Sequence, residues 1–219
     1  MPKVGVLLSG CGFLDGAEIH EAVFTLLTLD QHGATIVCCA PDIPQAAVVD
    51  HLTKEPTGEK RNVLHEAARI ARCEIQDVAN VRAADLDALI LPGGFGVAKN
   101  CSTIADDGPK GKVDPAVEKL IGDMLAAKKP IGAICIAPAL LARVAGARGV
   151  KARVTIGNDA GVAQAIATTG CVHEDRPTTE ITVDEEHKLV STPAYMLGPG
   201  PAAVHEGIRK LVEHILKMI

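Results

Sequence analysis

Aromatic residues are almost absent from this sequence. It has no tryptophan, one tyrosine and three phenylalanines among 219 residues, whereas apolar residues make up 47%. The hydrophobic core must therefore consist of valine, isoleucine, leucine and alanine. Such a core suits parallel strands that are covered by helices on both faces. The length is within the range of one α/β domain.

Positive charge and long apolar segments are also scarce. The formal net charge is −5, and no basic stripe points to nucleic acid or to an anionic membrane. The most apolar stretch, residues 130–147, contains Pro138 and Arg143 and is a poor membrane span. The first residues are followed too soon by Asp15 and Glu18 to resemble a signal peptide. We therefore expect neither a nucleic-acid partner nor a membrane partner.

Cysteine and histidine are present, but not in metal-binding or disulfide patterns. The seven cysteines are scattered without a C-x-x-C pair, no H-E-x-x-H motif occurs, and no cysteine–histidine cluster has zinc spacing. A dinucleotide-binding turn after the first strand is disfavoured because Asp15 stands where its third glycine should be. We predict no metal, no cofactor and a reducing, cytoplasmic location.

The order of apolar runs and helical periodicities predicts a mostly parallel α/β sheet with helices on both faces. The segment of about 42–80 is longer than a usual α/β connection, and we expect it to be an insertion packed on a single domain of residues 1–219. Strands are predicted at 4–8, 34–40, 74–78, 86–91, 131–134, 180–183 and 188–191, and helices at 17–32, 62–71, 114–128, from about 138, from 158 or 159 to 169, and at 201–217.

Cys135 is the most informative candidate residue. It stands directly between the apolar run 131–134 and a helix that begins near Pro138. Such an elbow places a nucleophile in a strained backbone conformation at the carboxyl edge of a sheet. The helix N-terminus there would favour thiolate over thiol. The alternative is that Cys135 is simply a buried core cysteine.

A glycine pair follows the predicted strand at 86–91. The amides of Gly93 and Gly94 could form an oxyanion hole together with the amide of Ile136, or the glycines could be a plain turn. Asn100 follows this turn, and we expect it either to line the pocket or to cap a helix there.

Two acids open the first predicted helix. Glu18 and Glu21 are three residues apart, so they share a helix face, and one of them could reach Cys135. A carboxyl group buried beside a thiol would have a raised pKa and could shuttle a proton. Alternatively, both acids simply favour the helix N-terminus.

Several segments together resemble a known family. Cys135 in GAICIAPALLA, the segment LILPGGFGVAKN, and Glu21 placed twelve residues before Gly33 resemble the PfpI-like superfamily of class I glutamine amidotransferase-like domains. The segments SGCGFLDGAEIHEA, RNVLHEAARIAR and STPAYM are most similar to its enhancing lycopene biosynthesis (ElbB) group, a glyoxalase-like branch. The resemblance covers nearly the whole chain.

The resemblance implies a flavodoxin-like three-layer sandwich, a homodimer and a catalytic pair of Cys135 and Glu21, with Glu18 as a neighbouring acid. It also assigns the family's glycine pair to Gly93 and Gly94. One difference stands out. Many relatives have a histidine about twenty residues after the cysteine, whereas residues 155–159 here contain none.

Two functions follow from these expectations. The first is a glyoxalase III-like lyase that converts methylglyoxal or glyoxal to a 2-hydroxy acid without cofactor, through a Cys135 hemithioacetal and a glutamate proton shuttle. The second is a non-enzymatic redox sensor or regulatory protein with an oxidisable Cys135. An amidotransferase half ranks lower, because it needs a base for the cysteine and a synthase partner.

Overall fold

Seven strands form the main sheet of the computed structural model, which describes residues 1–198 and 200–219. Neighbouring strands are parallel, except that the edge strand β8 runs antiparallel to β9. The order across the sheet is β3 (Ile75–Asp77), β2 (Thr35–Ala40), β1 (Lys3–Leu7), β4 (Ala88–Leu91), β5 (Ile131–Ile134), β9 (Leu189–Thr192) and β8 (Thr182–Asp184).

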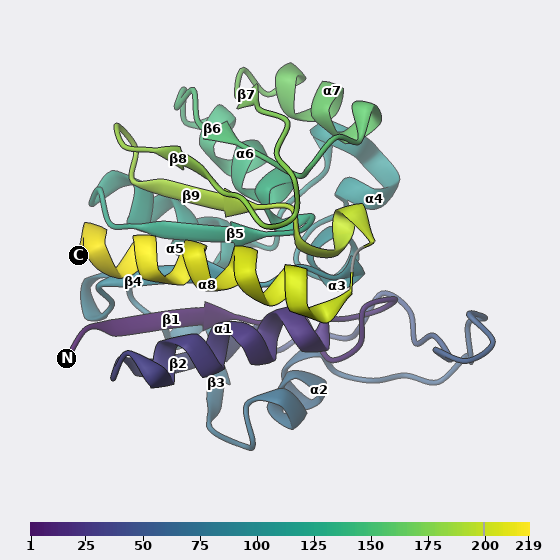
Figure 1. Ribbon diagram of the computed structural model, residues 1–219. Coiled ribbons are helices and arrows are strands. Elements are labelled where there is room, and N and C mark those ends of the chain that lie inside the picture. The colour runs from purple at the N-terminus through teal and green to yellow at the C-terminus, as the bar shows by residue number, and fades with distance from the viewer. Residues whose placement is uncertain (199) are drawn as a thin grey trace.

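Helices cover both faces of this sheet (Figure 1). One face packs against α1 (Ile19–Gln31), α2 (Val63–Ile70) and α8 (Pro201–Met218), and the other against α5 (Pro115–Ala126) and α6 (Ala137–Ala147). The predicted flavodoxin-like three-layer sandwich with a mostly parallel sheet is therefore confirmed.

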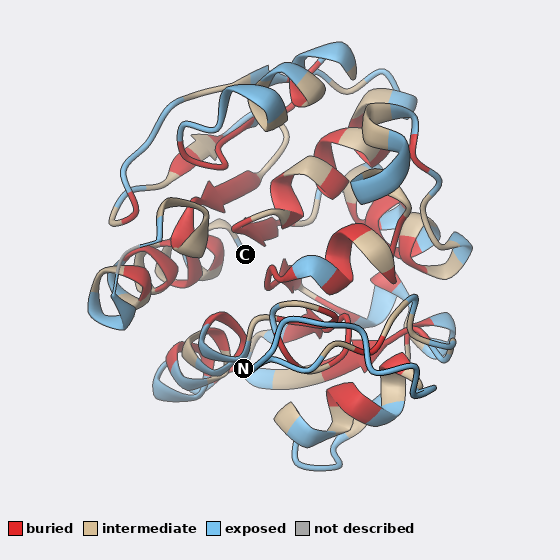
Figure 2. Cartoon of the chain, turned by 90° about the vertical axis from the view of Figure 1, so that its right-hand side faces the viewer, coloured by how far each residue is buried: buried red, intermediate tan, exposed pale blue. Residues whose placement is uncertain are grey.

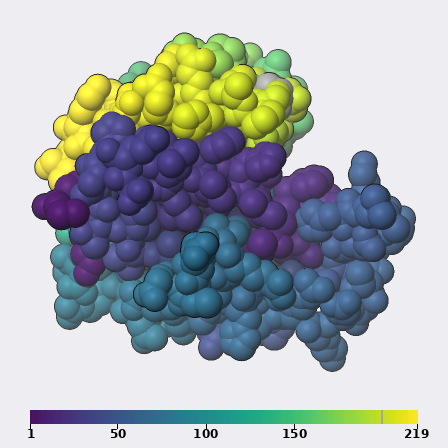
Figure 3. All heavy atoms as spheres, turned by 60° about the horizontal axis from the view of Figure 1, so that its bottom comes forward, coloured from purple at the N-terminus to yellow at the C-terminus, as the bar shows by residue number. Residues whose placement is uncertain are grey.

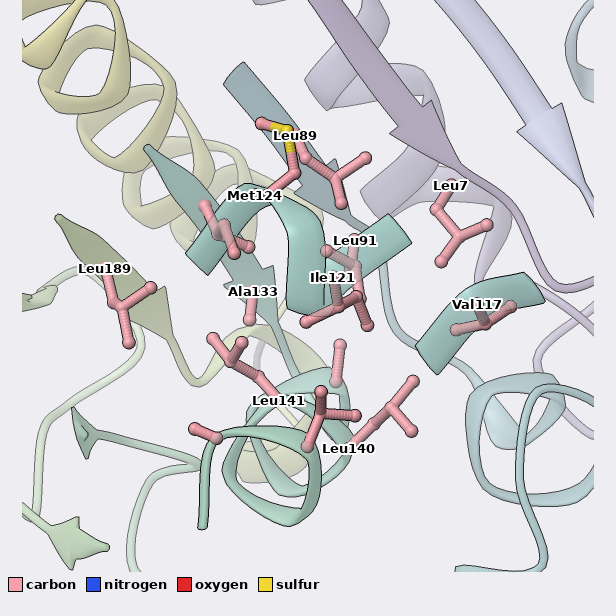
Figure 4. Packing of buried hydrophobic residues seen from close by; sticks show 14 of the residues in the cluster. Leu7, Leu89, Leu91, Val117, Ile121, Met124, Ala133, Leu140, Leu141 and Leu189 are labelled. Atoms are coloured by element: carbon pink, nitrogen blue, oxygen red, sulfur yellow. The ribbon is translucent and has the colours of Figure 1, made fainter. Parts of the chain in front are cut away.

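The core on the α5–α6 face is aliphatic, as the composition requires. Figure 4 shows Leu89, Leu91 and Ala133 of two neighbouring strands facing Leu140 and Leu141 of α6. Strands β4 and β5 are buried at every position, which is typical of parallel strands covered on both faces. Truncating one of these leucines to alanine would cost about 2–5 kcal/mol of stability. This packing fixes the carboxyl ends of β4 and β5 beside each other.

Capping residues set the starts of three long helices. The side chain of Glu18 accepts the Glu21 amide at the start of α1, Asp114 caps α5, and Asp159 caps α7 (Ala160–Thr168). The turn after α1 ends at Gly33, whose φ of +68° suits glycine. The sequence predicted the starts of these helices to within two residues, at 17, at 114 and at 158 or 159.

The smallest elements were not predicted. Among the described residues, β6 and β7 pair with each other in a separate two-stranded sheet. The additional elements are α3 (Phe95–Lys99), α4 (Ile104–Asp107), β6 (Arg153–Val154), β7 (Val172–His173) and the short 3-10 helices η1 (Val78–Asn80), η2 (Ala83–Asp85), η3 (Gly108–Lys110) and η4 (Ala194–Leu197). They lack the length from which periodicity could be recognised.

The segment that follows β2 lies against other loops at the carboxyl edge of the sheet. Figure 2 looks onto this edge, where exposed loops cross in front of buried strand ends. The Val49 amide donates to Asp15 Oδ2 at 2.8 Å, and the Ala46 amide donates to Asn100 Oδ1 at 2.9 Å. In Figure 3 this loop lies beside the purple N-terminal segment. The division of the chain into one domain with an insertion stays a prediction.

Candidate functional site

Cys135 occupies a strained turn between β5 and α6. Its φ is +62°, a region that residues with side chains rarely adopt, and its amide donates to the Thr192 carbonyl at 2.9 Å. The residue is 8% exposed and counts among the buried cysteines. Because β5 ends beside β4 and β9, the elbow brings Cys135 next to the loops that follow both strands.

Glu21 is the acid that contacts this cysteine. Its side chain is fully buried, and its carboxyl group is hydrogen-bonded to the Cys135 thiol. Oε2 accepts the Gly93 amide at 2.8 Å, and Oε1 accepts the Tyr195 amide at 3.3 Å. Three loops of the carboxyl edge therefore converge on one carboxyl group.

Burial dominates the electrostatics of this pair. It raises the pKa of Glu21 to about 8, with a further rise from the charge of Glu18, and the amides that the carboxyl accepts offset only part of this. Burial and the charge of Glu21 also raise the pKa of Cys135 well above its usual value. Two negative charges in contact in this buried space would repel each other, so Glu21 and Cys135 are not ionised together near neutral pH. The expected thiolate stabilisation by the helix N-terminus is outweighed by desolvation.

Glu18 has a different role from Glu21. It precedes α1 as the N-cap, and its Oε2 accepts the Glu21 amide at 2.7 Å. Its side chain is thus directed to the helix start. The sequence left open which acid meets the cysteine, and the structure places Glu21 there, whereas Glu18 acts on Glu21 through its charge and as a cap.

The expected three-amide oxyanion hole needs correction. The Gly93 amide donates to Glu21, so it cannot also be directed at a substrate oxygen. The amides of Gly94 and Ile136 instead face the Cys135 sulfur, where they lower its pKa. Gly94 has a φ of +98°, and a Cβ there would collide with the backbone of residues 16–18. Of the three expected amides, those of Gly94 and Ile136 therefore remain available to donate to an oxyanion.

Asn100 does not offer its amide to a pocket. Its Nδ2 donates to the carbonyls of Ser9 at 2.9 Å and Asp15 at 2.8 Å, while its Oδ1 accepts the Ala46 amide. Both hydrogens of the amide group are used, and the side chain is buried. Asn100 is consequently a structural bridge between two loops. It is also the C-cap residue of α3, as its expected role in capping a helix requires, and its side chain has no free amide hydrogen for a ligand.

Tyr195 was missed by the sequence analysis. Besides its amide contact with Glu21, its hydroxyl is hydrogen-bonded to His20 Nδ1 at 2.7 Å. The signal was available, because this only tyrosine lies three residues after the end of β9, and that end lies beside β5. The position of the loop after β9 could therefore have been anticipated.

The described residues hold no group of three or more histidine, cysteine or acidic side chains that could bind a metal ion. No described helix is long and apolar enough to span a membrane. The seven cysteines form no disulfide, and five of them, including Cys135, are buried.

Comparison with known proteins agrees with this architecture. Residues 12–189 match the DJ-1/PfpI family, which is most of the chain. The chain belongs to the DJ-1/PfpI family. It is 46% identical over 226 aligned positions to the human glutamine amidotransferase-like class 1 domain-containing protein 3, mitochondrial, covering 99% of this chain and 83% of that protein. It is 34% identical to the Danio rerio ES1 protein, mitochondrial, covering 99% of this chain and 86% of that protein.

Solved structures extend the family assignment. An isoprenoid biosynthesis protein with amidotransferase-like domain from Ehrlichia chaffeensis superposes with a TM-score of 0.94 at 39% identity, covering 100% of this chain and 99% of that one. Drosophila melanogaster DJ-1beta shares only the fold, with a TM-score of 0.55 at 18% identity over 99% of this chain and 95% of that one. The DJ-1/PfpI fold therefore holds across divergent sequences.

Proposed function

We propose that this DJ-1/PfpI protein is a glyoxalase III-like lyase that converts small 2-oxoaldehydes such as methylglyoxal and glyoxal to 2-hydroxy acids without cofactor. One observation carries the proposal: a fully buried Glu21 carboxyl group with a pKa of about 8 is hydrogen-bonded to the thiol of Cys135. A carboxylate with this pKa is a much stronger base than an ordinary one and is matched to proton transfer near neutral pH.

The first step forms a covalent adduct. The Cys135 sulfur bonds to the aldehyde carbon, the thiol proton passes to the Glu21 carboxylate, and the carbonyl electron pair moves to the oxygen. The amides of Gly94 and Ile136, which face the sulfur, are placed to donate to that oxygen. Glu21 then passes this proton to the oxygen, which completes the hemithioacetal and returns Glu21 to its carboxylate form.

The second step moves a proton between the two substrate carbons. Glu21 removes the hydrogen from the carbon bonded to sulfur, the electron pair forms an enediol with the neighbouring carbonyl, and a proton returns to that neighbouring carbon. The product is a thioester of a 2-hydroxy acid, which water hydrolyses to release the acid and the thiol. Only water is added overall, so no external oxidant or reductant is needed.

Lactate formation from methylglyoxal tests the proposal directly. Wild-type protein should produce lactate, and Cys135→Ala should abolish it, because no sulfur remains to form the adduct. Cys73→Ala removes an exposed cysteine elsewhere and should leave the rate unchanged. Wild-type turnover by Cys135→Ala, or no turnover by the wild type, would contradict the proposal.

The alternative proposal is a redox sensor or regulatory protein. The contact between Cys135 and a carboxyl group of raised pKa supports it, because a protonated carboxyl group can donate to an oxygen of a cysteine sulfinate. Mass spectrometry after mild peroxide treatment distinguishes the two functions. Selective oxidation of Cys135 without turnover of any dicarbonyl would favour the sensor.

Three finer assignments also remain proposals. We expect a homodimer and a cytoplasmic location, although the human and Danio rerio relatives are named mitochondrial. Membership of the enhancing lycopene biosynthesis group is supported by the resemblance of the motifs and by the description of the Ehrlichia chaffeensis protein as an isoprenoid biosynthesis protein.

A further inference from the structure

A largely apolar cavity of about 260 Å³ lies beside the elbow, between α3, α4, η3, α6 and α7. Val162 and Ile166 of α7 form one wall, facing residues of α3 and α6. Arg143 and Thr169 are the only polar side chains among the described residues that line it. A cavity this apolar suits a hydrocarbon group rather than a polar metabolite.

The cavity and the nucleophile share two backbone segments. Phe95 directly follows Gly94, and Ile136 directly follows Cys135. The amides of Gly94 and Ile136 face the sulfur, while the side chains of Phe95 and Ile136 line the cavity. Phe95 is 48% exposed, so part of this large apolar side chain stays in contact with solvent at the cavity. The cavity thus begins next to the reactive residue.

A second cavity of about 210 Å³ continues the first one outward. The two share Arg143, Pro109 and Thr169, and Lys110 lines the outer one. The Arg143 Nε donates to the Gly111 carbonyl at 3.0 Å, which anchors the guanidinium group. Neither cavity is lined by an acidic residue in the described part of the chain. The outer end is therefore positively charged, whereas the inner end is apolar.

We infer that these two cavities together, here called the elbow groove, bind an amphipathic anion. An alkyl or prenyl chain occupies the inner cavity, and a carboxylate or phosphate head group pairs with Arg143 and Lys110. Guanidinium and ammonium groups suit both kinds of head group. Binding does not require reaction at Cys135. The inference rests on the proposed function in one respect only: a substrate that carries such an alkyl or prenyl chain would place its reactive end at the Cys135 sulfur.

Isothermal titration of the 219-residue protein tests the elbow groove with octanoate, hexanoate, octyl phosphate and 1-octanol. Burial of two further methylene groups should make octanoate bind about tenfold more tightly than hexanoate. Both eight-carbon anions should bind more tightly than 1-octanol, and the tighter of the two identifies the preferred head group. Failure of both anions to bind would overturn the inference.

Substitutions at residues that line the elbow groove test whether octanoate binds there. Ala165→Phe fills the inner cavity and should weaken octanoate binding more than tenfold. Ala105→Phe is a second filling variant at an exposed lining position, where folding is not at risk. Lys110→Gln should weaken binding of the anions about threefold without affecting 1-octanol. Lys112→Gln, outside both cavities, is the matched control. Wild-type octanoate affinity in both filling variants would overturn the inference.

Cys135→Ala separates this inference from the proposed function. The variant should bind octanoate with wild-type affinity even though it lacks the proposed nucleophile. Octanoate binding without dicarbonyl turnover in the wild type would leave the groove in place and remove the glyoxalase assignment. Turnover of methylglyoxal without any binding of the eight-carbon anions would support the glyoxalase assignment and overturn the inference of the elbow groove.

Discussion

The main-chain amide of Gly93 donates to Glu21 Oε2 at 2.8 Å, and a side chain at Gly93 would occupy the space in which Glu21 meets Cys135. An added Cβ would lie 2.5 Å from the Cys135 Cβ and 2.7 Å from Glu21 Oε2. The glycine that follows β4 therefore permits the cysteine–glutamate contact by having no side chain.

Gly93→Ala should separate the pair. We expect the free energy of unfolding to fall by about 2 kcal/mol through overpacking, and dicarbonyl turnover to fall with it. Urea denaturation and lactate formation provide the measurements. Gly161→Ala is a suitable control because its Cβ would meet only Oδ1 of Asp159, at 3.3 Å, and it should change stability by less than about 1 kcal/mol. Equal effects of the two substitutions would contradict this role of Gly93.

Glu21 should make stability depend on pH. Its folded pKa of about 8 lies above the ordinary value of 4.5, so the folded protein keeps a proton that the unfolded chain loses. This stabilisation is fully present below about pH 4.5 and is lost as pH rises through about 8. Between pH 5 and 8 the free energy of unfolding should decline by at most about 1.4 kcal/mol per pH unit.

Glu21→Gln removes the titrating group and should flatten this decline in urea denaturation series. It should also shift alkylation of Cys135 to lower pH, because the charge of Glu21 raises the pKa of the thiol. Glu55→Gln, at an exposed position, is the control. An unchanged alkylation profile in Glu21→Gln would mean that the carboxyl group is not the neighbour of the thiol.

Asn100→Ala should destabilise the fold without weakening substrate binding. It would leave the carbonyls of Ser9 and Asp15 and the Ala46 amide without their partner, which should cost about 2–4 kcal/mol. KM for a dicarbonyl should stay within about twofold, since no polar atom of Asn100 is available to a ligand. A large rise in KM at unchanged stability would restore Asn100 to the substrate pocket. Asn158→Ala, at an exposed position, is the control.

The predicted homodimer can be tested on α1. Ile19, Val23 and Leu27 form an exposed apolar row at four-residue spacing, each 42–44% exposed, and Figure 3 shows this helix at the surface beside α8. If the row is an interface, Val23→Glu should convert the dimer to a monomer in light scattering after gel filtration. Leu52→Glu changes a leucine that is 91% exposed on the loop after β2, and it should not alter the mass. A monomeric wild type would contradict the prediction.

The sequence predicted the long elements and the position of the elbow because those depend on local patterns. Strand β5 begins and ends at the predicted residues, and Cys135 directly follows it. The network around the pair depends on contacts between distant parts of the chain, such as Gly93 with Glu21, 72 positions apart. No local pattern indicates that the Gly93 amide is used by a carboxyl group rather than left for a substrate.

Asn100 illustrates the same limit. Its place after the glycine turn suggested a pocket residue, yet its three hydrogen bonds join the loops that follow β1 and β2, which the sequence could not place together. Burial likewise decided the ionisation of Cys135, whereas the sequence argument considered only the helix N-terminus.

The position of Tyr195 has a spectroscopic consequence. The chain has no tryptophan and no second tyrosine, and the backbone amide of this one residue is bound to the Glu21 carboxyl group. Its phenol ring is therefore the source of all the tyrosine emission of the protein, and it belongs to a residue whose backbone adjoins the cysteine–glutamate pair. Quenching of that emission would report on events at the elbow without any label having been attached.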